Sequence, residues 1–188
     1  MHRKLIACFR TLDMPVLEST LGDITRLEVA AIVNAANERM LGGGGVDGAI
    51  HAAAGPRLYE ACLALPEIEP GIRSREGSAI TTPGFNLSCR YIIHTVGPRW
   101  RGGGQGEASV LESCYRACIL AAGNMGVDSI AFPAISTGVF GYPKHLAAPI
   151  AVDAVRRALP DAKSITRVIF CAFDSEWKQL IDAQLEGA

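Results

Sequence analysis

Short apolar segments alternate along the chain with longer segments in which apolar residues recur at helical spacing. A short, continuously apolar segment is typical of a strand that is covered on both faces of a sheet. Six segments of this kind lie at residues 14–19, 30–35, 78–82, 91–96, 129–134 and 167–173. Helical spacing is found at residues 47–64, 107–125, 144–158 and 175–185. This alternation predicts an α/β fold with a mostly parallel central sheet and helices on both faces.

Parallel sheets of this kind bind ligands at the carboxyl ends of their strands, where the connecting loops meet. The loops of interest begin near Ala36, Gly97, Ala134 and Phe173. We therefore expect the functional residues to lie in or beside these loops.

The length and the charge balance narrow the function classes. A chain of 188 residues fits one domain of ordinary size. Lys and Arg total 18 and Asp and Glu total 19, so the formal net charge is −1. General nucleic-acid binding is disfavoured, because affinity for phosphate backbones needs an excess of basic residues. A pocket for a phosphorylated small molecule remains compatible, since backbone N–H groups can hold an anion.

The cysteines and the amino-terminal segment point to a reduced, soluble protein. The six cysteines form no C-x-x-C pair, and no histidine lies at a spacing that would complete a zinc site. We therefore predict reduced core thiols and no metal. The first residues show no signal peptide, and no apolar run is long enough to span a bilayer. The expectation is a cytoplasmic protein that does not associate with membranes.

Residues 32–51 carry the most information about function. The segment passes from an apolar strand through Asn34 and Asn37, across four glycines at 42–45, to Asp47 at the start of a helix. Glycines allow positive φ and close approach of a ligand, and N–H groups at a helix start favour phosphate. Asp47 would repel a phosphate, so it either caps the helix or binds sugar hydroxyls or a water. The two amides suit a polyol such as ribose.

His51 follows Asp47 by four residues, so the two side chains share one face of the predicted helix. We interpret this pair as a structural hydrogen bond rather than a catalytic dyad.

Residues 131–143 form a second strand-following loop of the same type. Ser136, Thr137, Gly138 and Gly141 supply backbone and hydroxyl donors that could surround a phosphate. The aromatic residues at 140 and 142 either stack against a ligand or plug the core. Two glycine-rich loops facing one crevice would suit a diphosphate.

Three other families are disfavoured by their own requirements. Gly43, Gly45 and Gly48 match the dinucleotide fingerprint, but five residues separate it from its strand, and no acidic residue lies at a strand end about 20 residues later. Ser136 mimics a hydrolase nucleophile, yet no acidic residue lies between it and His145. The chain contains no G-K-[ST] sequence, which excludes a P-loop.

Two further residues each have two possible roles. Asp23 could bond an exocyclic amine of a base or cap a local turn with Thr25. Phe173, at the end of the last strand, could cover a bound base or complete the core.

Together these segments resemble the macrodomain family, and within it the MacroD-type branch that includes bacterial O-acetyl-ADP-ribose deacetylases. The resemblance covers residues 22–188 and implies one macrodomain over residues 1–188, with a three-layer α/β/α fold and a mixed sheet. Its motifs are GDIT at 22–25, NAAN at 34–37, GGGGVDGAI at 42–50, HTVGP at 94–98 and PAISTGVFGYP at 133–143.

The resemblance also implies a set of binding residues. Adenine would be recognised by Asp23 with the Ile24 backbone, and Phe173 matches loosely the position that lies along the base. Asn37, helped by Asn34, would hold the distal ribose. The diphosphate and the distal ribose would be wrapped by two loops, comprising Gly44, Gly45, Val46 and Asp47 in the first, and Ser136, Thr137, Gly138, Val139 and Phe140 in the second.

The implied activity is hydrolysis of esters of ADP-ribose, without metal or cofactor. The ligands would be ADP-ribose and O-acetyl-ADP-ribose, with ADP-ribosylated proteins as further substrates. Asp47 would act as general base or orient the water, with Asn34 and Asn37 beside it. In one alternative, a ligand phosphate oxygen accepts the proton and Asp47 positions the ribose. In another, the chain is a non-catalytic reader of ADP-ribose.

Overall fold

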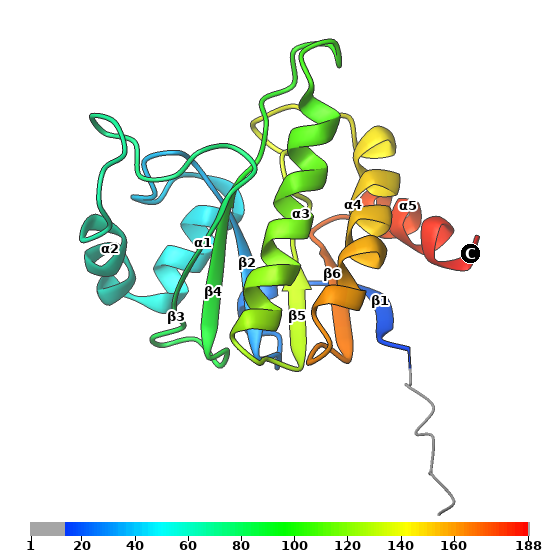
Figure 1. The fold of residues 1–188 in the computed structure, drawn as a ribbon, viewed down its shortest axis with the longest axis horizontal. Coiled ribbons are helices and arrows are strands. Elements are labelled where there is room, and N and C mark those ends of the chain that lie inside the picture. Colours follow the sequence, from blue (N-terminus) through cyan, green and yellow to red (C-terminus); the bar gives the residue numbers. More distant parts are fainter. Residues whose placement is uncertain (1–13, 188) are drawn as a thin grey trace, which may run out of the picture.

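A six-stranded sheet forms the centre of the protein (Figure 1). The structure is a computed structural model that describes residues 14–187. The strand order across the sheet is β1-β6-β5-β2-β4-β3. The strands are β1 (Val16–Leu21), β2 (Ala31–Ala36), β3 (Ala79–Pro83), β4 (Tyr91–Val96), β5 (Ser129–Phe132) and β6 (Arg167–Ala172).

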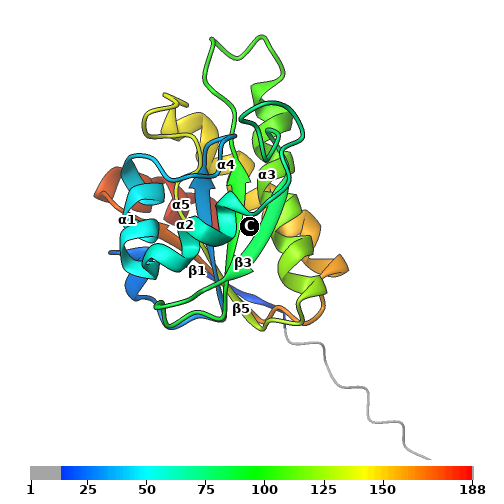
Figure 2. The same ribbon diagram turned by 90° about the vertical axis from the view of Figure 1, so that its left-hand side faces the viewer.

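Helices cover both faces of this sheet. Helices α3, α4 and α5 lie on one face, and α1 and α2 lie on the other (Figures 1 and 2). Two short 3₁₀ segments, η1 (Ile24–Arg26) and η2 (Leu159–Asp161), complete the elements. The helices are α1 (Gly45–Ala54), α2 (Pro56–Leu63), α3 (Glu107–Asn124), α4 (Lys144–Ala158) and α5 (Ser175–Glu186).

Within residues 14–187, five strands of the sheet are parallel to one another, and only β3 pairs antiparallel, with its neighbour β4. The predicted α/β class with a mostly parallel sheet is therefore confirmed. The antiparallel edge implied by the resemblance is also present, which makes the sheet mixed.

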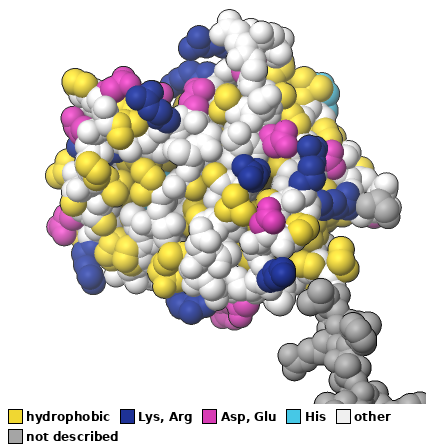
Figure 3. All heavy atoms as spheres, in the orientation of Figure 1, with side chains coloured by type: hydrophobic (Ala, Val, Ile, Leu, Met, Phe, Trp, Pro, Cys, Tyr) yellow, Lys and Arg dark blue, Asp and Glu magenta, His cyan; other side chains and the backbone are white. Residues whose placement is uncertain are grey.

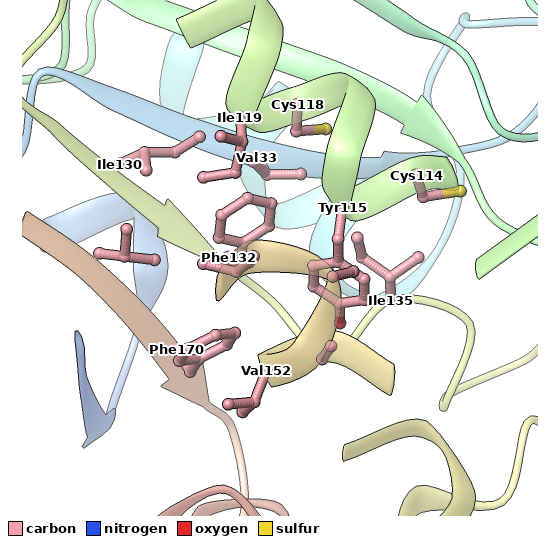
Figure 4. Close-up of a cluster of buried hydrophobic side chains, with 14 of the residues drawn as sticks. Val33, Cys114, Tyr115, Cys118, Ile119, Ile130, Phe132, Ile135, Val152 and Phe170 are labelled. Atoms are coloured by element: carbon pink, nitrogen blue, oxygen red, sulfur yellow. The ribbon is translucent and has the colours of Figure 1, made fainter. Parts of the chain in front are cut away.

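The alternation of side chains along each strand divides the core into two parts. In β2, Val33 points toward α3 and α4, whereas Ile32 joins the cluster beneath α1 and α2. The larger cluster has Phe132 at its centre, with ring centroids 5.2 Å from Tyr115 and 6.1 Å from Phe170 (Figure 4). Asn34 has the same parity as Ile32, so the sheet directs this amide toward α1.

The predicted helix over residues 47–64 is wrong as a single element. The chain forms α1, which begins at Gly45, and then α2, which begins at Pro56. Gly55 separates them with φ +82°, a conformation that side chains other than glycine rarely adopt. Pro56 cannot donate the hydrogen bond that a continuous helix would need, but it suits the first position of a new one.

The strand predicted at residues 129–134 is shorter in the structure. It ends at Phe132, because Pro133 has no N–H for the sheet ladder. The predicted first strand is displaced by two residues, to Val16–Leu21. The other strand and helix limits differ from the prediction by at most two residues at their ends.

The cysteines within residues 14–187 are buried thiols: Cys62, Cys89, Cys114, Cys118 and Cys171. Burial raises the pKa of the Cys62 and Cys171 thiols to about 11, so both are protonated at neutral pH. Cys8 lies outside the described residues.

Surface charge is mixed in sign. On the face drawn in Figure 3, basic and acidic side chains are interspersed rather than gathered by sign. No helix among residues 14–187 has both the length and the apolar character needed to cross a membrane.

The aromatic cluster generates a stability prediction. Phe132→Ala removes a fully buried ring that contacts two others, and we expect it to lower the free energy of unfolding by about 3–5 kcal/mol. Leu146→Ala, at a side chain that is 41% exposed, is the control and should cost less than about 1 kcal/mol. Urea unfolding measures both. Equal losses for the two variants would show that the ring cluster does not dominate the core.

Candidate functional site

The parallel topology gathers five loops at one edge of the sheet, the upper edge in Figure 1. Each of the five parallel strands ends at this edge, and each is followed by a residue that the sequence singled out. These residues are Asp23 after β1, Asn37 after β2, Gly97 after β4, the segment from Ala134 after β5, and Phe173 after β6.

The glycine-rich loop leads into α1 with an uncapped helix start. Gly44 is the N-cap residue, and no side chain accepts a hydrogen bond from the first turn. The N–H groups of that turn therefore point outward with the positive end of the helix dipole, which suits an anion. Gly42 and Gly45 have φ of +81° and +61°, so the loop needs glycine at both positions. Val46, in the first turn, is half-buried.

Asp47 is a buried carboxylate in the first turn of α1. Its side chain is 3% exposed, and its Oδ1 accepts a hydrogen bond of 2.7 Å from Asn34 Nδ2. Burial raises the pKa of Asp47, against the lowering effects of the Asn34 hydrogen bond and of His51. Asp47 Oδ2 has no hydrogen-bond partner within residues 14–187. A raised pKa and an unused oxygen are properties that suit a general base.

His51 lies beside Asp47, but the prediction of a hydrogen bond between them is wrong. Its Nε2 is 3.6 Å from Asp47 Oδ1, which is too long for a hydrogen bond. The one-turn spacing brings the two side chains to the same helix face, and the charge interaction remains.

Asn34 connects Asp47 to a second buried residue, His94 of β4. Asn34 Nδ2 lies 3.0 Å from His94 Nδ1, and His94 Nε2 lies 2.9 Å from Thr82 Oγ1. Asn34 and His94 are direct partners in the parallel register of β2 and β4, which places their side chains next to each other. The sequence assigned no role to His94, although it lies in the HTVGP motif, because strand register is not readable from a motif.

Asn37 closes the glycine-rich loop. Its Nδ2 donates to the Gly42 carbonyl at 2.9 Å, and its Oδ1 accepts from Arg39 N at 3.0 Å. A Cβ added to Gly43 would lie 3.0 Å from Asp47 Oδ2 and 3.2 Å from Asn37 Nδ2. Asn37 and Asp47 therefore converge on the Gly43 backbone, where only glycine leaves both side chains undisturbed.

The loop after β5 presents a second set of backbone N–H donors. The N–H groups of Gly138, Val139 and Phe140 donate to no acceptor in the described part of the chain. Thr137 turns inward instead, and its hydroxyl donates to the Ala134 carbonyl at 3.1 Å. Consecutive N–H groups of this kind form an anion-binding concavity.

Ser136 is the strained residue of this loop. Its φ is +65°, its side chain is buried, and its Oγ has no partner among residues 14–187. A Cβ on Gly97 would lie 2.1 Å from Ser136 Oγ, so the loop after β4 supports the loop after β5. The sequence indicated both positions but not their contact.

Arg99 and Trp100, in the loop after β4, contact Phe140 of the loop after β5, and sequence reasoning missed these two residues. Trp100 N donates to the Phe140 carbonyl at 2.8 Å, and the Trp100 ring packs on Tyr142 with centroids 4.6 Å apart. The Arg99 guanidinium lies 4.3 Å from the centre of the Phe140 ring. The excess of arginine, glycine and tryptophan in this loop was the available sequence signal.

Asp23 adopts the turn that the sequence allowed. Its Oδ1 accepts from Thr25 N at 2.9 Å and from Thr25 Oγ1 at 2.7 Å, and these bonds lower the pKa of Asp23. The carboxylate is exposed, and its Oδ2 lies 3.6 Å from Arg26 Nε. Ile24 is buried. Capping the turn uses Oδ1, whereas Oδ2 lies beside the exposed Arg26 guanidinium.

Phe173 does not complete the core. Its side chain is 93% exposed, and Val139 on the neighbouring loop is 86% exposed. Asp174 caps α5 by accepting from Trp177 N, and Lys144 donates to the same carboxylate at 2.9 Å. The interpretation of Phe173 as a core residue is therefore wrong, because its ring projects outward from the edge of the sheet at which the parallel strands end.

Two surface hollows border the α1 side of this edge. One, of about 490 Å³, is lined by Gly42, Gly43, His51 and Tyr59 among others, and it lies next to the Asp47 loop. The other, of about 510 Å³, reaches Asp23 and Thr25. Among residues 14–187 no three His, Cys, Asp or Glu side chains are grouped as a metal site would need.

Comparison with known proteins agrees with this geometry. The chain matches the family model described as Macro domain over residues 33–151. A macro domain-containing protein of Xanthomonas axonopodis pv. citri is 52% identical over 158 residues, covering 84% of this chain and 88% of that protein. An O-acetyl-ADP-ribose deacetylase of Salmonella gallinarum is 50% identical over 169 residues, covering 87% and 90%.

Solved structures show the same fold. The Oceanobacillus iheyensis macrodomain with ADP has a TM-score of 0.87 and 40% identity, over 95% of this chain and 94% of that one. The Trypanosoma brucei macrodomain in complex with ADP-ribose has a TM-score of 0.78 and 36% identity, over 90% and 68%.

The fold and the site define a three-layer α/β/α protein in which two loops with N–H groups that are unpaired within residues 14–187 lie beside a buried carboxylate. The chain belongs to the Macro domain family.

The buried carboxylate generates a prediction about the pH dependence of stability. Because the folded-state pKa of Asp47 is raised, folding becomes less favourable as pH rises above the ordinary value of 3.8. Asp47→Asn removes this penalty, so the stability of the variant relative to the wild type should increase as pH rises above 3.8. Urea unfolding across that range measures the difference.

Asp23→Asn is the matched control with the opposite sign. The folded-state pKa of Asp23 is lowered by Thr25, so its contribution is present above 3.8 and lost as pH falls. A constant difference between Asp47→Asn and wild type over the whole range would contradict a raised pKa.

Proposed function

We propose that this chain binds ADP-ribose along the carboxyl edge of the sheet and hydrolyses ester bonds to its distal ribose. The substrates are O-acetyl-ADP-ribose, from which acetate is released, and proteins that carry ADP-ribose on Asp or Glu side chains. The two donor loops bind the diphosphate, and Asp23 at the far end of the edge recognises adenine. The cytoplasm is the proposed location.

The observation that carries the proposal is the environment of Asp47. This carboxylate is buried, has a raised pKa, and keeps Oδ2 without a partner among the described residues. A buried acceptor without a partner costs stability, and such groups are retained where a ligand or a reaction uses them. Asp47 lies at the junction of the uncapped helix start and the Asn37 loop, where a distal ribose would follow the diphosphate.

The chemistry of this site follows from the position of that oxygen. A water attacks the acyl carbon of the ester, and its proton passes to Asp47 Oδ2. The bond between the acyl carbon and the ribose oxygen then breaks, and the ribose oxygen takes the proton from Asp47. The N–H groups after Ser136 neutralise the diphosphate, which keeps the nearby carboxylate from repelling the ligand.

The relatives support the proposal by their names. The similar Salmonella gallinarum protein is named O-acetyl-ADP-ribose deacetylase, whereas the Xanthomonas relative is named only for its macro domain. The solved macrodomains hold ADP or ADP-ribose. Ligand class is thus supported by structures at 36–40% identity, and hydrolysis by names at about 50%.

The decisive experiment compares Asp47→Ala with the wild type on O-acetyl-ADP-ribose and on a protein with glutamate-linked ADP-ribose. We expect turnover of at least one substrate by the wild type and a loss of about 10²–10⁴-fold in the variant, because a general base contributes that much. Asp153→Ala, at an exposed carboxylate on α4, is the control and should keep full activity.

Three outcomes separate the alternatives. Tight ADP-ribose binding by calorimetry without any product would identify a non-catalytic reader. Undetectable ADP-ribose binding would overturn both proposals. If Asp47→Asn retains most of the wild-type rate, a ligand phosphate oxygen accepts the proton and Asp47 positions the ribose.

Adenine recognition generates its own prediction. Asp23→Ala removes the exposed carboxylate oxygen, and we expect ADP-ribose affinity to fall about tenfold or more, the cost of one charge-assisted hydrogen bond. The affinity for ribose 5-phosphate, which lacks adenine, should not change. Isothermal calorimetry measures both. A parallel loss for the two ligands would place Asp23 away from the base.

A further inference from the structure

The Asn34 amide is held in one orientation by two acceptors. Its Nδ2 lies 2.7 Å from Asp47 Oδ1 and 3.0 Å from His94 Nδ1, so each hydrogen of the amide has one partner. Rotating the amide by 180° would bring Asn34 Oδ1 against the Asp47 carboxylate oxygen, which would repel it. The carboxylate therefore selects this orientation, in which the second amide hydrogen faces His94 Nδ1.

This orientation leaves two oxygens of the site unused. Asn34 Oδ1 and Asp47 Oδ2 are buried and have no hydrogen-bond partner among the described residues. Asn34 is fully buried and Asp47 is 3% exposed. Buried oxygens that accept no bond from the protein are the acceptors that remain for a ligand hydroxyl or a water.

His94 can serve as an acceptor only in one tautomer. An amide NH₂ group only donates, so His94 Nδ1 must be unprotonated where it faces Asn34. The ring proton then lies on Nε2, 2.9 Å from Thr82 Oγ1, which accepts it. Burial lowers the pKa of His94 to about 3, and the nearby His51 acts in the same direction. The ring is fully buried between strands and therefore stays neutral.

The register of the sheet explains why these groups meet. Asn34 on β2 pairs directly with His94 on β4. Thr82 and His94 lie on adjacent antiparallel strands, on the face covered by α1. The antiparallel edge strand β3 thus supplies an acceptor for the ring N–H of a histidine on the neighbouring strand β4.

We propose that His94, as the Nε2–H tautomer whose ring proton Thr82 accepts, is a positioning residue that fixes the Asn34 amide and so orients Asp47 and the two unused oxygens. The inference rests on the proposed function, since it deepens the account of the same site. Neither His94 nor Thr82 touches the ligand in this scheme. Their effect on the reaction passes through Asn34 and Asp47.

The tautomer is measured directly by ¹⁵N NMR on the full chain with labelled histidine, without substrate. The chain has four histidines, and His94→Asn identifies the His94 signal by its disappearance. We expect an unprotonated Nδ1 and a protonated Nε2 that do not change between about pH 5 and about pH 8. An Nδ1–H tautomer, or a ring that gains a second proton in this range, would overturn the proposal.

The orientation of the amide is tested with a pair of His94 variants. His94→Asn places an amide oxygen near the position of Nδ1 and should keep the Asn34 NH₂ protected from hydrogen exchange. His94→Leu has no acceptor and should lose that protection. With a wild type that turns over, kcat of the Leu variant should fall about tenfold or more, with a smaller change in KM, and the Asn variant should recover most of it.

Thr82 supplies a second pair that tests the same point with a milder change. Thr82→Val removes the acceptor for Nε2–H at constant shape and leaves this buried N–H unpaired, so the Nε2–H tautomer should be destabilised and kcat should fall. Thr82→Ser keeps the hydroxyl and should behave like the wild type. Thr81→Val, at the adjacent position on the opposite face of β3, is the matched control and should change nothing. The Thr82 pair decides the matter if His94→Leu does not fold.

The failure of this inference is distinct from the failure of the proposed function. A wild type without turnover overturns hydrolysis, but the tautomer and the exchange of the Asn34 amide still decide the role of His94. Equal losses of kcat for His94→Leu and His94→Asn, or Asn34 protection that survives in the Leu variant, would show that His94 is only a core residue.

Discussion

The site depends on one constraint: the Asp47 carboxylate is buried against the central sheet and, within residues 14–187, accepts a hydrogen bond from one side chain only. Burying a charged group costs free energy unless it is paired, and Asp47 is paired only in part. The Asn34 amide offsets some of this cost, and the unused oxygen leaves the rest in place. A sequence selected only for stability would place an apolar residue there, so the constraint is characteristic of function.

The surrounding backbone is arranged to permit this burial. A Cβ on Gly48 would lie 2.6 Å from the Gly43 carbonyl oxygen, so α1 and the glycine-rich loop touch without side chains between them. That contact brings the start of the helix over the end of β2, where the buried Asn34 lies. The uncapped helix start and the buried carboxylate are therefore parts of one local structure.

The second half of the site is held by loops that support each other. The Gly97 backbone packs against the Ser136 side chain, and the Trp100 N–H donates a hydrogen bond to the Phe140 carbonyl. A positive φ at Ser136 costs free energy, because a residue with a side chain is strained there. The close packing of the neighbouring loop maintains this conformation. Donors that are fixed before a ligand arrives lose little entropy on binding, and this rigidity suits a diphosphate.

By itself, the sequence determined the class of the fold and the loops that carry the chemistry. Apolar runs and helical periods predicted the elements, because burial on one or two faces leaves a one-dimensional pattern. It also predicted Asn34, Asn37 and Asp47 as one group, since they lie within fourteen residues of each other along the chain. The single helix over 47–64 was wrong where Gly55 and Pro56 carried the opposing signal.

Only the tertiary structure decided which distant residues meet. His94 reaches Asn34 across 60 residues through strand register, and Ser136 meets Gly97 through the adjacency of two loops. Register and adjacency are set by the packing of the whole sheet, and no local pattern encodes them. The outward position of Phe173 and the missing bond between His51 and Asp47 have the same origin. Differences in distance of a few tenths of an ångström decide such contacts, and three-dimensional packing alone sets these distances.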